Sequence, residues 1–423
     1  MRAQHVQHAQ HEQRRLHATM AEQGLWPDRA PWIREAMERT PRHTFAPDRL
    51  WRWDGAAYRP VERATEPRRW LAELYAGPHD PAVTQIDGGV PSSSLSAPAV
   101  VADMLDTALL APGRRVLELG TGCGWNAALL AGRVGGEHVV SVEADRSLAE
   151  SARRALDGAA PGVTVLHGDG GAGHPVGGPY DRVIATYAPP RVPWEWVAQT
   201  RPGGWIVTPW GRLGHVALRV ARDGGSASGW FQGLAQFMPP RGTPPTPPWP
   251  GGAADAALAP GVPLGRDPGP LLADANLFFA LRVALPDVHI TAAPGTGAGV
   301  WPQGSAGAGS GAAARPGAPA PADAESEAEA ASHTAPETAS TPPAGRAAPA
   351  TVRLLAPGGS RALLDGRTGT VRRTGPRDLA SEVAMAWSRW EECGSPSVHD
   401  HGLTVTPYGE HLWTDPGHEP CGV

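Results

Sequence analysis

The sequence predicts an α/β fold built on a doubly wound parallel sheet. Between Val100 and Met238, short apolar runs alternate with amphipathic helical stretches, which is typical of parallel strands covered by helices on both faces. One of these runs enters a glycine-rich turn followed by a helix, an arrangement found where such sheets bind ligands. A polar region, residues 1–90, precedes the sheet, and a Pro-rich linker, residues 242–270, follows it.

The elements of the central region can be assigned in order from their apolar patterns. Apolar residues recur at helical spacing over residues 100–110, 126–134 and 147–158. Short apolar runs bounded by turn residues predict strands over 114–119, 137–144, 163–169, 180–188 and 203–210. Residues 91–241 are therefore predicted to form one domain, with residues 1–90 as a helical and loop layer in front of it.

The C-terminal region, residues 271–423, is predicted to be a small α+β module. Its expected elements are a strand-like run at 276–286, a strand at 351–357, a hairpin at 360–373, a helix at 378–392 and a final hairpin at 402–414. The stretch 296–350 consists mainly of Ala, Pro, Gly and Ser with an acidic patch. Because it has little apolar surface to bury, we expect it to be a disordered insert.

Composition narrows the classes of function. The 423 residues include 37 basic and 42 acidic ones, and a net charge of −5 disfavours binding to nucleic acid through a basic face. The basic residues are all arginine, which excludes chemistry that depends on a lysine side chain. No segment resembles a signal peptide or a membrane span. We therefore expect a cytoplasmic protein without a membrane partner.

A glycine-rich turn carries the most informative chemistry. The first predicted strand ends near Glu118 and leads into a turn that contains the candidate ligand-binding residues Gly120, Thr121, Gly122 and Gly124. Glycines at alternate positions allow a ligand to approach the backbone closely. A carboxylate just before them would repel a phosphate. Glu118 therefore favours a cationic, amine-bearing ligand such as S-adenosylmethionine over a dinucleotide.

Acidic residues also follow the next two predicted strands. Glu143 lies about 20 residues after the first glycine, where a carboxylate can bind ribose hydroxyls. Asp169 and Gly170 follow the third strand, and Asp169 would be within reach of an adenine amine. Because ligands bind outside the carboxyl ends of parallel strands, these residues and the glycine turn predict a single pocket for S-adenosylmethionine.

Six segments carry a resemblance to a known family. They are PRHTFAP (41–47), SSSLSAPAVVADML (92–105), VLELGTGCGW (116–125), HGDGGAG (167–173), PYDRVIATYAPPRVP (179–193) and RPGGWIVTPWG (201–211). Together they resemble the protein-L-isoaspartate (D-aspartate) O-methyltransferases over roughly residues 41–241. The resemblance implies a Rossmann-like class I methyltransferase sheet and S-adenosylmethionine as cofactor. It also implies methyl transfer to an aspartyl or isoaspartyl carboxylate in a peptide or protein.

The same resemblance implies the catalytic residues. Ser96 stands where the family has its active-site serine, and Ser94 replaces a threonine, so the two hydroxyls would hold the substrate carboxylate. The chain departs from the family at residues 91–93, which replace a glycine-rich run, and at Cys123 and Trp125, which replace serine and tyrosine. The first departure lies in the substrate site, where the resemblance is least informative.

Three biological roles remain open. The segments GPRDLASEVAMAWSRWEECGSP (375–396) and GLTVTPYGEHLWTD (402–415) resemble the C-terminal region of actinobacterial homologues associated with ribosomally made peptide natural products. That resemblance implies methylation of an aspartate in a precursor peptide, leading to an aspartimide. General repair of isoaspartyl damage is the alternative, and a non-catalytic scaffold that binds S-adenosylmethionine is the third. The oligomeric state stays open.

A metal site at the C-terminus is considered and not expected. The side chains that suggest one are Cys393, His399, His401, His411, His418 and Cys421. They contain no Cys-x-x-Cys pair, and their spacing is irregular for a structural zinc site.

Cys123 and a group of tryptophans each have two interpretations. Cys123 is expected to be a small filler beside the glycine turn, because no basic partner adjoins it in the sequence. Trp51, Trp53 and Trp70 are expected to pack the N-terminal layer, with a peptide-binding groove as the alternative.

Overall fold

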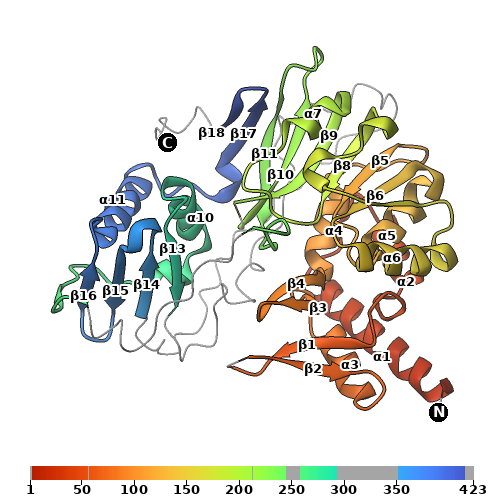
Figure 1. The fold of residues 1–423 in the computed structure, drawn as a ribbon, viewed down its shortest axis with the longest axis horizontal. Coiled ribbons are helices and arrows are strands. Elements are labelled where there is room, and N and C mark those ends of the chain that lie inside the picture. The colour runs from red at the N-terminus through yellow and green to blue at the C-terminus, as the bar shows by residue number, and fades with distance from the viewer. Residues whose placement is uncertain (1, 56, 212, 244–257, 293–350, 415–423) are drawn as a thin grey trace, which may run out of the picture.

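The described part of the chain contains three β-sheets with helices packed on them. The computed structural model describes residues 2–55, 57–211, 213–243, 258–292 and 351–414. Figure 1 shows a nine-stranded central sheet, a four-stranded N-terminal sheet below it and a five-stranded C-terminal sheet beside it. The predicted disordered insert and about half of the Pro-rich linker lie outside the described residues.

The parallel part of the central sheet has the predicted doubly wound form. Its strands are β5 (Val116–Leu119), β6 (Val139–Glu143), β7 (Thr164–His167), β8 (Tyr180–Ala185) and β9 (Thr200–Trp210). They lie in the order β7-β6-β5-β8-β9 and are parallel to one another. The chain lays down β5, β6 and β7 in one direction and then returns to β8 on the other side of β5. The strand order therefore switches between β5 and β8, the position where such sheets bind ligands.

Helices cover both faces of this sheet. One face packs against α4 (Pro98–Thr107), α5 (Trp125–Val134) and α6 (Arg146–Ala159). Helix α2 (Trp32–Arg39) lies on α4 and α5, and α1 (Arg2–Glu22) contacts α3 (Pro67–Leu74). The other face packs against α7 (Trp194–Ala198). Val116 belongs to the first core and Leu117 to the second, as expected of a strand that is buried on both faces. No described helix is both long and apolar enough to cross a membrane.

The N-terminal region contains strands where the sequence predicted helices and loops. The strands β1 (Arg49–Trp53), β2 (Tyr58–Glu62), β3 (Ala82–Asp87) and β4 (Val90–Leu95) pair in the order β2-β1-β3-β4, and α3 (Pro67–Leu74) lies against β1. The loop prediction was wrong because β2 and β4 contain Pro and β4 contains three Ser in a row, which gives a weak strand signal. Asp54 and Gly55 begin the turn between β1 and β2, and Gly55 has a φ of 103°. An Asp-Gly pair between alternating residues is the signal that could have identified this hairpin.

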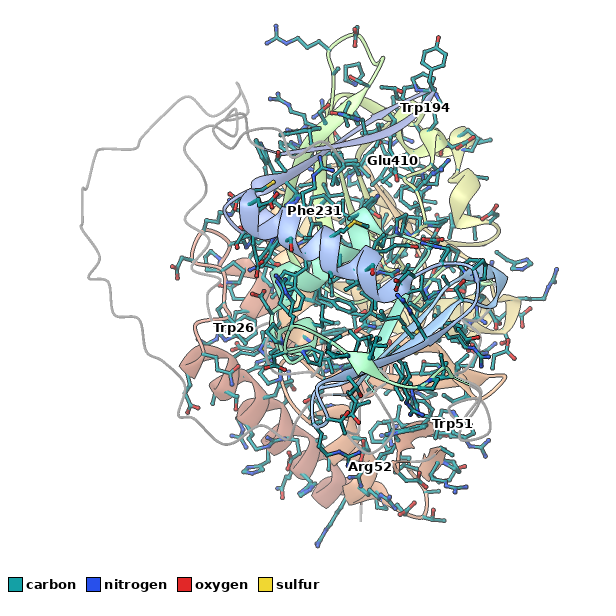
Figure 2. The ribbon with its side chains drawn as sticks, turned by 90° about the vertical axis from the view of Figure 1, so that its left-hand side faces the viewer. Trp26, Trp51, Arg52, Trp194, Phe231 and Glu410 are labelled. Carbon is teal, nitrogen blue, oxygen red and sulfur yellow. The ribbon has the colours of Figure 1, made fainter. Side chains whose placement is uncertain are left out.

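Four antiparallel strands extend the central sheet beyond β9. They are β10 (Gly214–Val220), β11 (Ala227–Leu234), β17 (His401–Thr406) and β18 (Gly409–Thr414). The final hairpin, β17–β18, was expected in the C-terminal module, but β17 pairs with β11. Glu410 on β18, which is labelled in Figure 2, lies in the upper part of that view. It accepts hydrogen bonds from the Val192 amide at 3.0 Å and from the Trp210 indole at 3.1 Å. The prediction differed because this pairing joins strands that are far apart in the sequence.

The separate C-terminal module is a five-stranded antiparallel sheet with helices. Its strands are β12 (Val262–Pro263), β13 (His289–Ala292), β14 (Thr351–Leu355), β15 (Arg361–Asp365) and β16 (Thr370–Thr374). Its helices are α9 (Pro270–Ala273), α10 (Ala275–Ala284) and α11 (Leu379–Glu392). An α+β module was predicted here, and the hairpin β15–β16 and helix α11 lie where they were expected.

The run predicted as a strand at 276–286 forms helix α10 instead. Asp274 caps this helix by accepting hydrogen bonds from two backbone N–H groups of its first turn. Leu277 and Leu281 pack in the core of the C-terminal module, whereas Phe279 packs against the central sheet. A helix between two cores has no single apolar stripe, so its periodicity did not distinguish it from a buried strand.

Replacing Phe279 by alanine should separate α10 from the central sheet. Phe279 is 1% exposed, and its ring lies 5.0 Å from that of Phe231. The cavity left behind should lower the free energy of unfolding by about 3–5 kcal/mol, measured by urea denaturation. Met385→Ala, at a position on α11 that is 65% exposed, should change it by less than about 0.5 kcal/mol. Equal effects of the two substitutions would contradict this packing.

Candidate functional site

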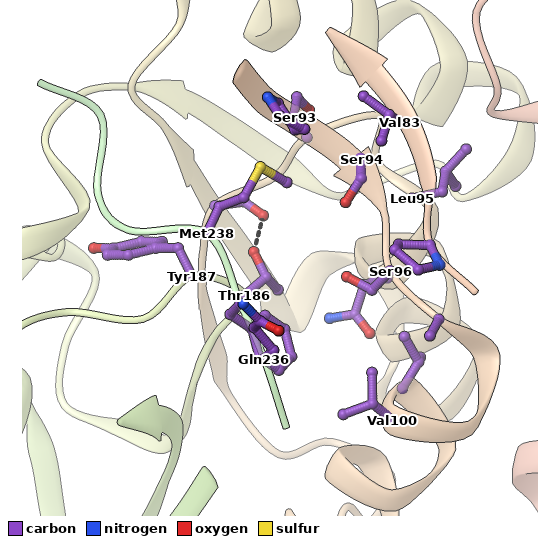
Figure 3. A pocket seen from close by; sticks show the side chains of 18 of the residues that line it. Val83, Ser93, Ser94, Leu95, Ser96, Val100, Thr186, Tyr187, Gln236 and Met238 are labelled. Carbon is purple, nitrogen blue, oxygen red and sulfur yellow. Dashed lines mark hydrogen bonds between the residues drawn. The ribbon is translucent and has the colours of Figure 1, made fainter. Parts of the chain in front are cut away.

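A cavity of about 860 Å³ opens at the carboxyl ends of the parallel strands. Its wall includes the glycine turn after β5, the ends of β6 and β8, strand β4, and residues 234–241 after β11. Figure 3 shows Ser94 and Ser96 on one side, with Tyr187 and Met238 across from them. The cavity therefore lies at the switch in strand order.

The glycine turn leaves the cavity wall free of side chains at Gly120 and Gly122. Gly120, Gly122 and Gly124 have φ values of 97°, 54° and 88°, in the region that other residues rarely adopt. A Cβ at Gly120 would lie 2.4 Å from Thr186 Oγ1, and one at Gly124 would lie 3.2 Å from the Leu156 side chain. At Gly122 the nearest atom would be 3.8 Å away. A ligand can therefore approach the backbone at Gly122, while Gly124 packs behind the cavity and does not line it.

Glu143 lines the cavity and is held by the backbone. Its carboxylate accepts hydrogen bonds from the amides of Gly122 at 2.8 Å and Asp145 at 3.0 Å. Arg241, in the segment after β11, lies 3.8 Å from the Glu143 carboxylate and 3.4 Å from that of Asp145. Arg241 also donates to Gln85 on β3, and Gln85 donates to Asp145. The sequence analysis missed Arg241 and Gln85, because only the folded chain brings them to Glu143.

Asp169 and Gly170 form the neighbouring part of the wall. The Asp169 carboxylate accepts a hydrogen bond from the Gly171 amide at 2.8 Å. The Gly170 carbonyl accepts one from the Trp196 indole at 2.8 Å, and a Cβ at Gly170 would lie 2.6 Å from the Tyr187 hydroxyl. Burial raises the pKa of that hydroxyl. Tyr187 is a cavity residue that the sequence analysis did not single out.

Glu118 lies beneath the glycine turn and does not line the cavity. It is fully buried, and its carboxylate accepts hydrogen bonds from the Ser141 hydroxyl and, at 2.8 Å, from the Asn126 amide. Thr121 lines the cavity, and its hydroxyl lies 2.6 Å from that of Ser141. Glu118 is therefore not placed to contact a cationic ligand in the cavity, although such a contact was expected. Its hydrogen bonds instead stabilise the glycine turn from below. Burial raises the pKa of Glu118 to about 7, against the opposing effect of these hydrogen bonds.

Ser94 and Ser96 lie at the end of β4, and both line the cavity. A Cβ at Gly122 would lie 3.9 Å from the Ser94 carbonyl oxygen. The residues predicted for the cofactor and those predicted for the substrate therefore meet at one place.

Arg42 holds the serine segment from behind. Its guanidinium is buried and donates to the carbonyl oxygens of Leu95 at 3.2 Å and Ser96 at 3.1 Å. It also lies 5.2 Å from the centre of the Trp125 ring. Burial lowers the pKa of Arg42 to about 10, so the side chain stays charged at neutral pH. A buried positive charge beneath Ser96 favours a negatively charged group in the cavity.

Cys123 lies on the cavity wall, and burial raises the pKa of its thiol to about 11. A thiol that stays protonated at neutral pH is a poor nucleophile, which agrees with the filler interpretation.

No metal cluster is found in the part of the chain that the structure describes. There, no group of three or more His, Cys, Asp or Glu side chains is placed to hold a metal ion. Cys393 is disulfide-bonded and so is not available as a thiolate ligand. His418 and Cys421 lie outside the described residues.

The three tryptophans of the N-terminal region lie in two different environments. Trp70 is 1% exposed and packs in the core, as predicted. Trp51 and Trp53 line the cavity, and a peptide-binding groove at this place stays a prediction.

Comparison with known proteins gives a consistent family. A family model described as protein-L-isoaspartate(D-aspartate) O-methyltransferase matches residues 12–239. A protein-L-isoaspartate O-methyltransferase of Pyrococcus horikoshii is 43% identical over 150 residues, which are 34% of this chain and 68% of that protein. The enzyme of Hyperthermus butylicus is 37% identical over 209 residues, 46% of this chain and 76% of that protein. Protein-L-isoaspartate O-methyltransferase 1 of Archaeoglobus fulgidus is 34% identical over 209 residues, 49% of this chain and 84% of that protein.

The raised pKa of Glu118 predicts a pH-dependent stability. An unfolded glutamate titrates near 4.5, whereas Glu118 titrates near 7 in the folded chain. The folded state thus binds this proton more tightly, and the resulting stabilisation is present below pH 4.5 and lost as the pH rises to about 7. Glu118→Gln should remove this pH-dependent decrease in the free energy of unfolding, which amounts to about 3 kcal/mol. Urea unfolding at pH 5 and pH 8 measures it.

Asp48→Asn is the matched control, because the Asp48 side chain is 85% exposed. This variant should follow the pH dependence of the unmodified protein. If Glu118→Gln also follows it, the raised pKa is contradicted.

Proposed function

The chain belongs to the protein-L-isoaspartate(D-aspartate) O-methyltransferase family, and we propose that its cavity binds S-adenosylmethionine next to an aspartyl or isoaspartyl carboxylate of a peptide. Membership makes the chain an S-adenosylmethionine-dependent carboxyl methyltransferase that acts on protein or peptide substrates. The observation that supports this use of the cavity is that the predicted cofactor residue Gly122 adjoins the predicted substrate residue Ser94. A Cβ added at Gly122 would lie 3.9 Å from the Ser94 carbonyl oxygen.

The residues at the end of the cavity formed by the glycine turn and the ends of β6 and β7 fit the cofactor. Gly122 lines the cavity without a side chain, so a ligand can lie against its backbone. Glu143 is placed to accept hydrogen bonds from ribose hydroxyls, and Asp169 to accept one from the adenine amine. When bound, S-adenosylmethionine supplies a methyl group on a positively charged sulfur. Two carboxylates on the wall favour such a cation.

At the other end, the substrate carboxylate needs little chemical help. A carboxyl group with an ordinary pKa near 4 is already ionised at neutral pH, so no general base is required. Ser94 and Ser96 would donate hydrogen bonds to this carboxylate, with the charge of Arg42 behind them. These hydrogen bonds would hold one carboxylate oxygen in line with the methyl group of the cofactor. This proximity supplies most of the acceleration of methyl transfer.

We further propose that the substrate is a ribosomally made peptide. The C-terminal extension lies beyond the region that the family model matches, and Ala275, the first residue of α10, lines the cavity. An extension that reaches the site can contribute to recognition of a larger substrate. In this role the next backbone amide nitrogen attacks the methyl ester, loses its proton and expels methanol, which closes an aspartimide ring. General repair of isoaspartyl residues is the alternative role.

A non-catalytic scaffold is the third possibility. A scaffold would need the cofactor end of the cavity alone. Ser94, Ser96 and the buried Arg42 behind them form a substrate end in the same cavity, which favours an enzyme.

Replacing Glu143 by alanine should weaken cofactor binding. The change removes an acceptor for the ribose and for the Gly122 amide. Loss of a charge-assisted hydrogen bond should lower the affinity for S-adenosylmethionine about tenfold or more, measured by calorimetry. Glu137→Ala is the control, because this carboxylate precedes the opposite end of β6 and its side chain is 72% exposed. Unchanged affinity in the Glu143 variant would refute the assigned cofactor site.

Replacing Arg42 should affect the substrate end alone. Arg42→Met keeps much of the buried volume but removes the donor to Leu95 and Ser96. We expect kcat/KM for an isoaspartyl peptide to fall about tenfold or more, with the Kd for S-adenosylmethionine unchanged. Arg42→Lys keeps the charge and should recover part of the activity. If cofactor affinity and activity fell together, Arg42 would serve the fold and not the substrate.

The two biological roles predict different substrates. A tailoring enzyme should methylate an aspartyl precursor peptide with a higher kcat/KM than short isoaspartyl peptides, because contacts remote from the carboxylate raise turnover. A repair enzyme should prefer isoaspartyl peptides and be indifferent to the surrounding sequence. Methyl transfer to matched aspartyl and isoaspartyl peptides measures the preference. Efficient turnover of unrelated isoaspartyl peptides would favour repair.

A further inference from the structure

One face of the N-terminal sheet continues from Ser94 to aromatic side chains. Val83 on β3 pairs with Ser94 on β4 and also with Trp51 on β1. Side chains of directly paired residues point to the same face of a sheet, so these three form one row across the strands. All three line the cavity. The wall that carries Ser94 therefore extends to Trp51.

Trp53 and Tyr58 extend the same wall outward. They pair across the β1–β2 hairpin, and their ring centroids lie 5.1 Å apart. Both line the cavity, and Trp53 is 44% exposed. We call Trp51, Trp53 and Tyr58 the aromatic rim. Its exposed indole contrasts with the buried Trp70, so the rim leaves apolar surface in water beside the cavity.

The opposite face of β1 lies towards α3. Leu50 is fully buried there, and Arg52 forms an ion pair at 3.0 Å with Glu73 on α3; the two ion-paired residues also border the cavity. Because side chains alternate along a strand, Trp51 and Trp53 point away from α3. In Figure 2, Trp51 and Arg52 lie near one end of the molecule and Trp194 near the other.

The register sets the distance from the rim to the reacting group. Two strand spacings of about 4.8 Å separate β4 from β1, so the rim begins about 10 Å from Ser94. An extended peptide covers that distance with about three residues. We propose that the aromatic rim binds an aromatic or large apolar side chain about three residues from the aspartyl or isoaspartyl residue that is methylated. This rests on the proposed function, because Ser94 marks the position of the carboxylate.

The chemistry of the rim fits this occupant. Aromatic rings bury a large area against one another with little loss of side-chain freedom, and stacked pairs add to the gain from burial. Such binding lies away from the carboxylate but can be used to hold it in line for transfer, which raises kcat/KM.

A series of peptides with one aromatic residue tests the proposal. Aspartyl and isoaspartyl peptides of Gly and Ser would carry a single Phe at each position from four before to four after the reacting residue. Phe about three residues away, on one side, should raise kcat/KM about tenfold over the peptide without Phe. Trp53→Ala and Tyr58→Ala should each move this ratio towards one. Tyr408→Ala, at a 99% exposed aromatic in the β17–β18 turn, should keep the ratio of the unmodified protein.

The outcomes separate the rim from the underlying activity. Methyl transfer with the same kcat/KM at every Phe position, or a preference that both rim variants retain, would overturn the rim and leave the proposed function intact. No methyl transfer to any peptide by a protein that binds S-adenosylmethionine would overturn the proposed function, and the rim with it.

Discussion

The hydrogen bond from the Gly122 amide to Glu143 joins β5 and β6 at the edge where the cavity opens. Its donor lies in a turn with positive φ, and its acceptor ends the next parallel strand, so the bond depends on both the glycine turn and the strand order. Glu118 supports the turn from below, while Arg241 meets Glu143 from the side of the segment after β11. The substrate end depends on the same turn, because Ser94 adjoins Gly122. One local geometry therefore positions both halves of the site.

The fold was predictable where its contacts are local. Each parallel strand, its turn and its helix form a unit of about thirty residues, so the apolar pattern from β5 to β9 carried the information. The N-terminal sheet was missed because its strands are polar, although Asp54-Gly55 marked one turn. Helix α10 was missed because Leu277 and Phe279 serve two different cores. The pairing of β17 with β11 could not be predicted, because the residues of a strand do not specify which distant strand it pairs with.

The candidate site shows the same division. The glycines, Glu143 and Asp169 could be chosen because the ends of successive parallel strands meet at one edge. The direction of Glu118 could have been inferred as well: it alternates with Leu117 and Leu119, which face the second core, so its side chain points towards α5. Arg42 could not be assigned in this way. Its partners are backbone carbonyl groups more than fifty residues away. Because every residue has a backbone carbonyl, the sequence does not indicate which ones accept this hydrogen bond.

The pairing of β11 with β17 also sets an order of events during synthesis. β11 ends at Leu234, and β17 begins only at His401. A ribosome that adds 5–20 residues per second leaves the edge of β11 without its partner for about 10 to 30 s. An unpaired strand edge is a template for pairing with another chain. The growing polypeptide therefore exposes the edge of β11 after its methyltransferase core has emerged and until β17 pairs with that edge.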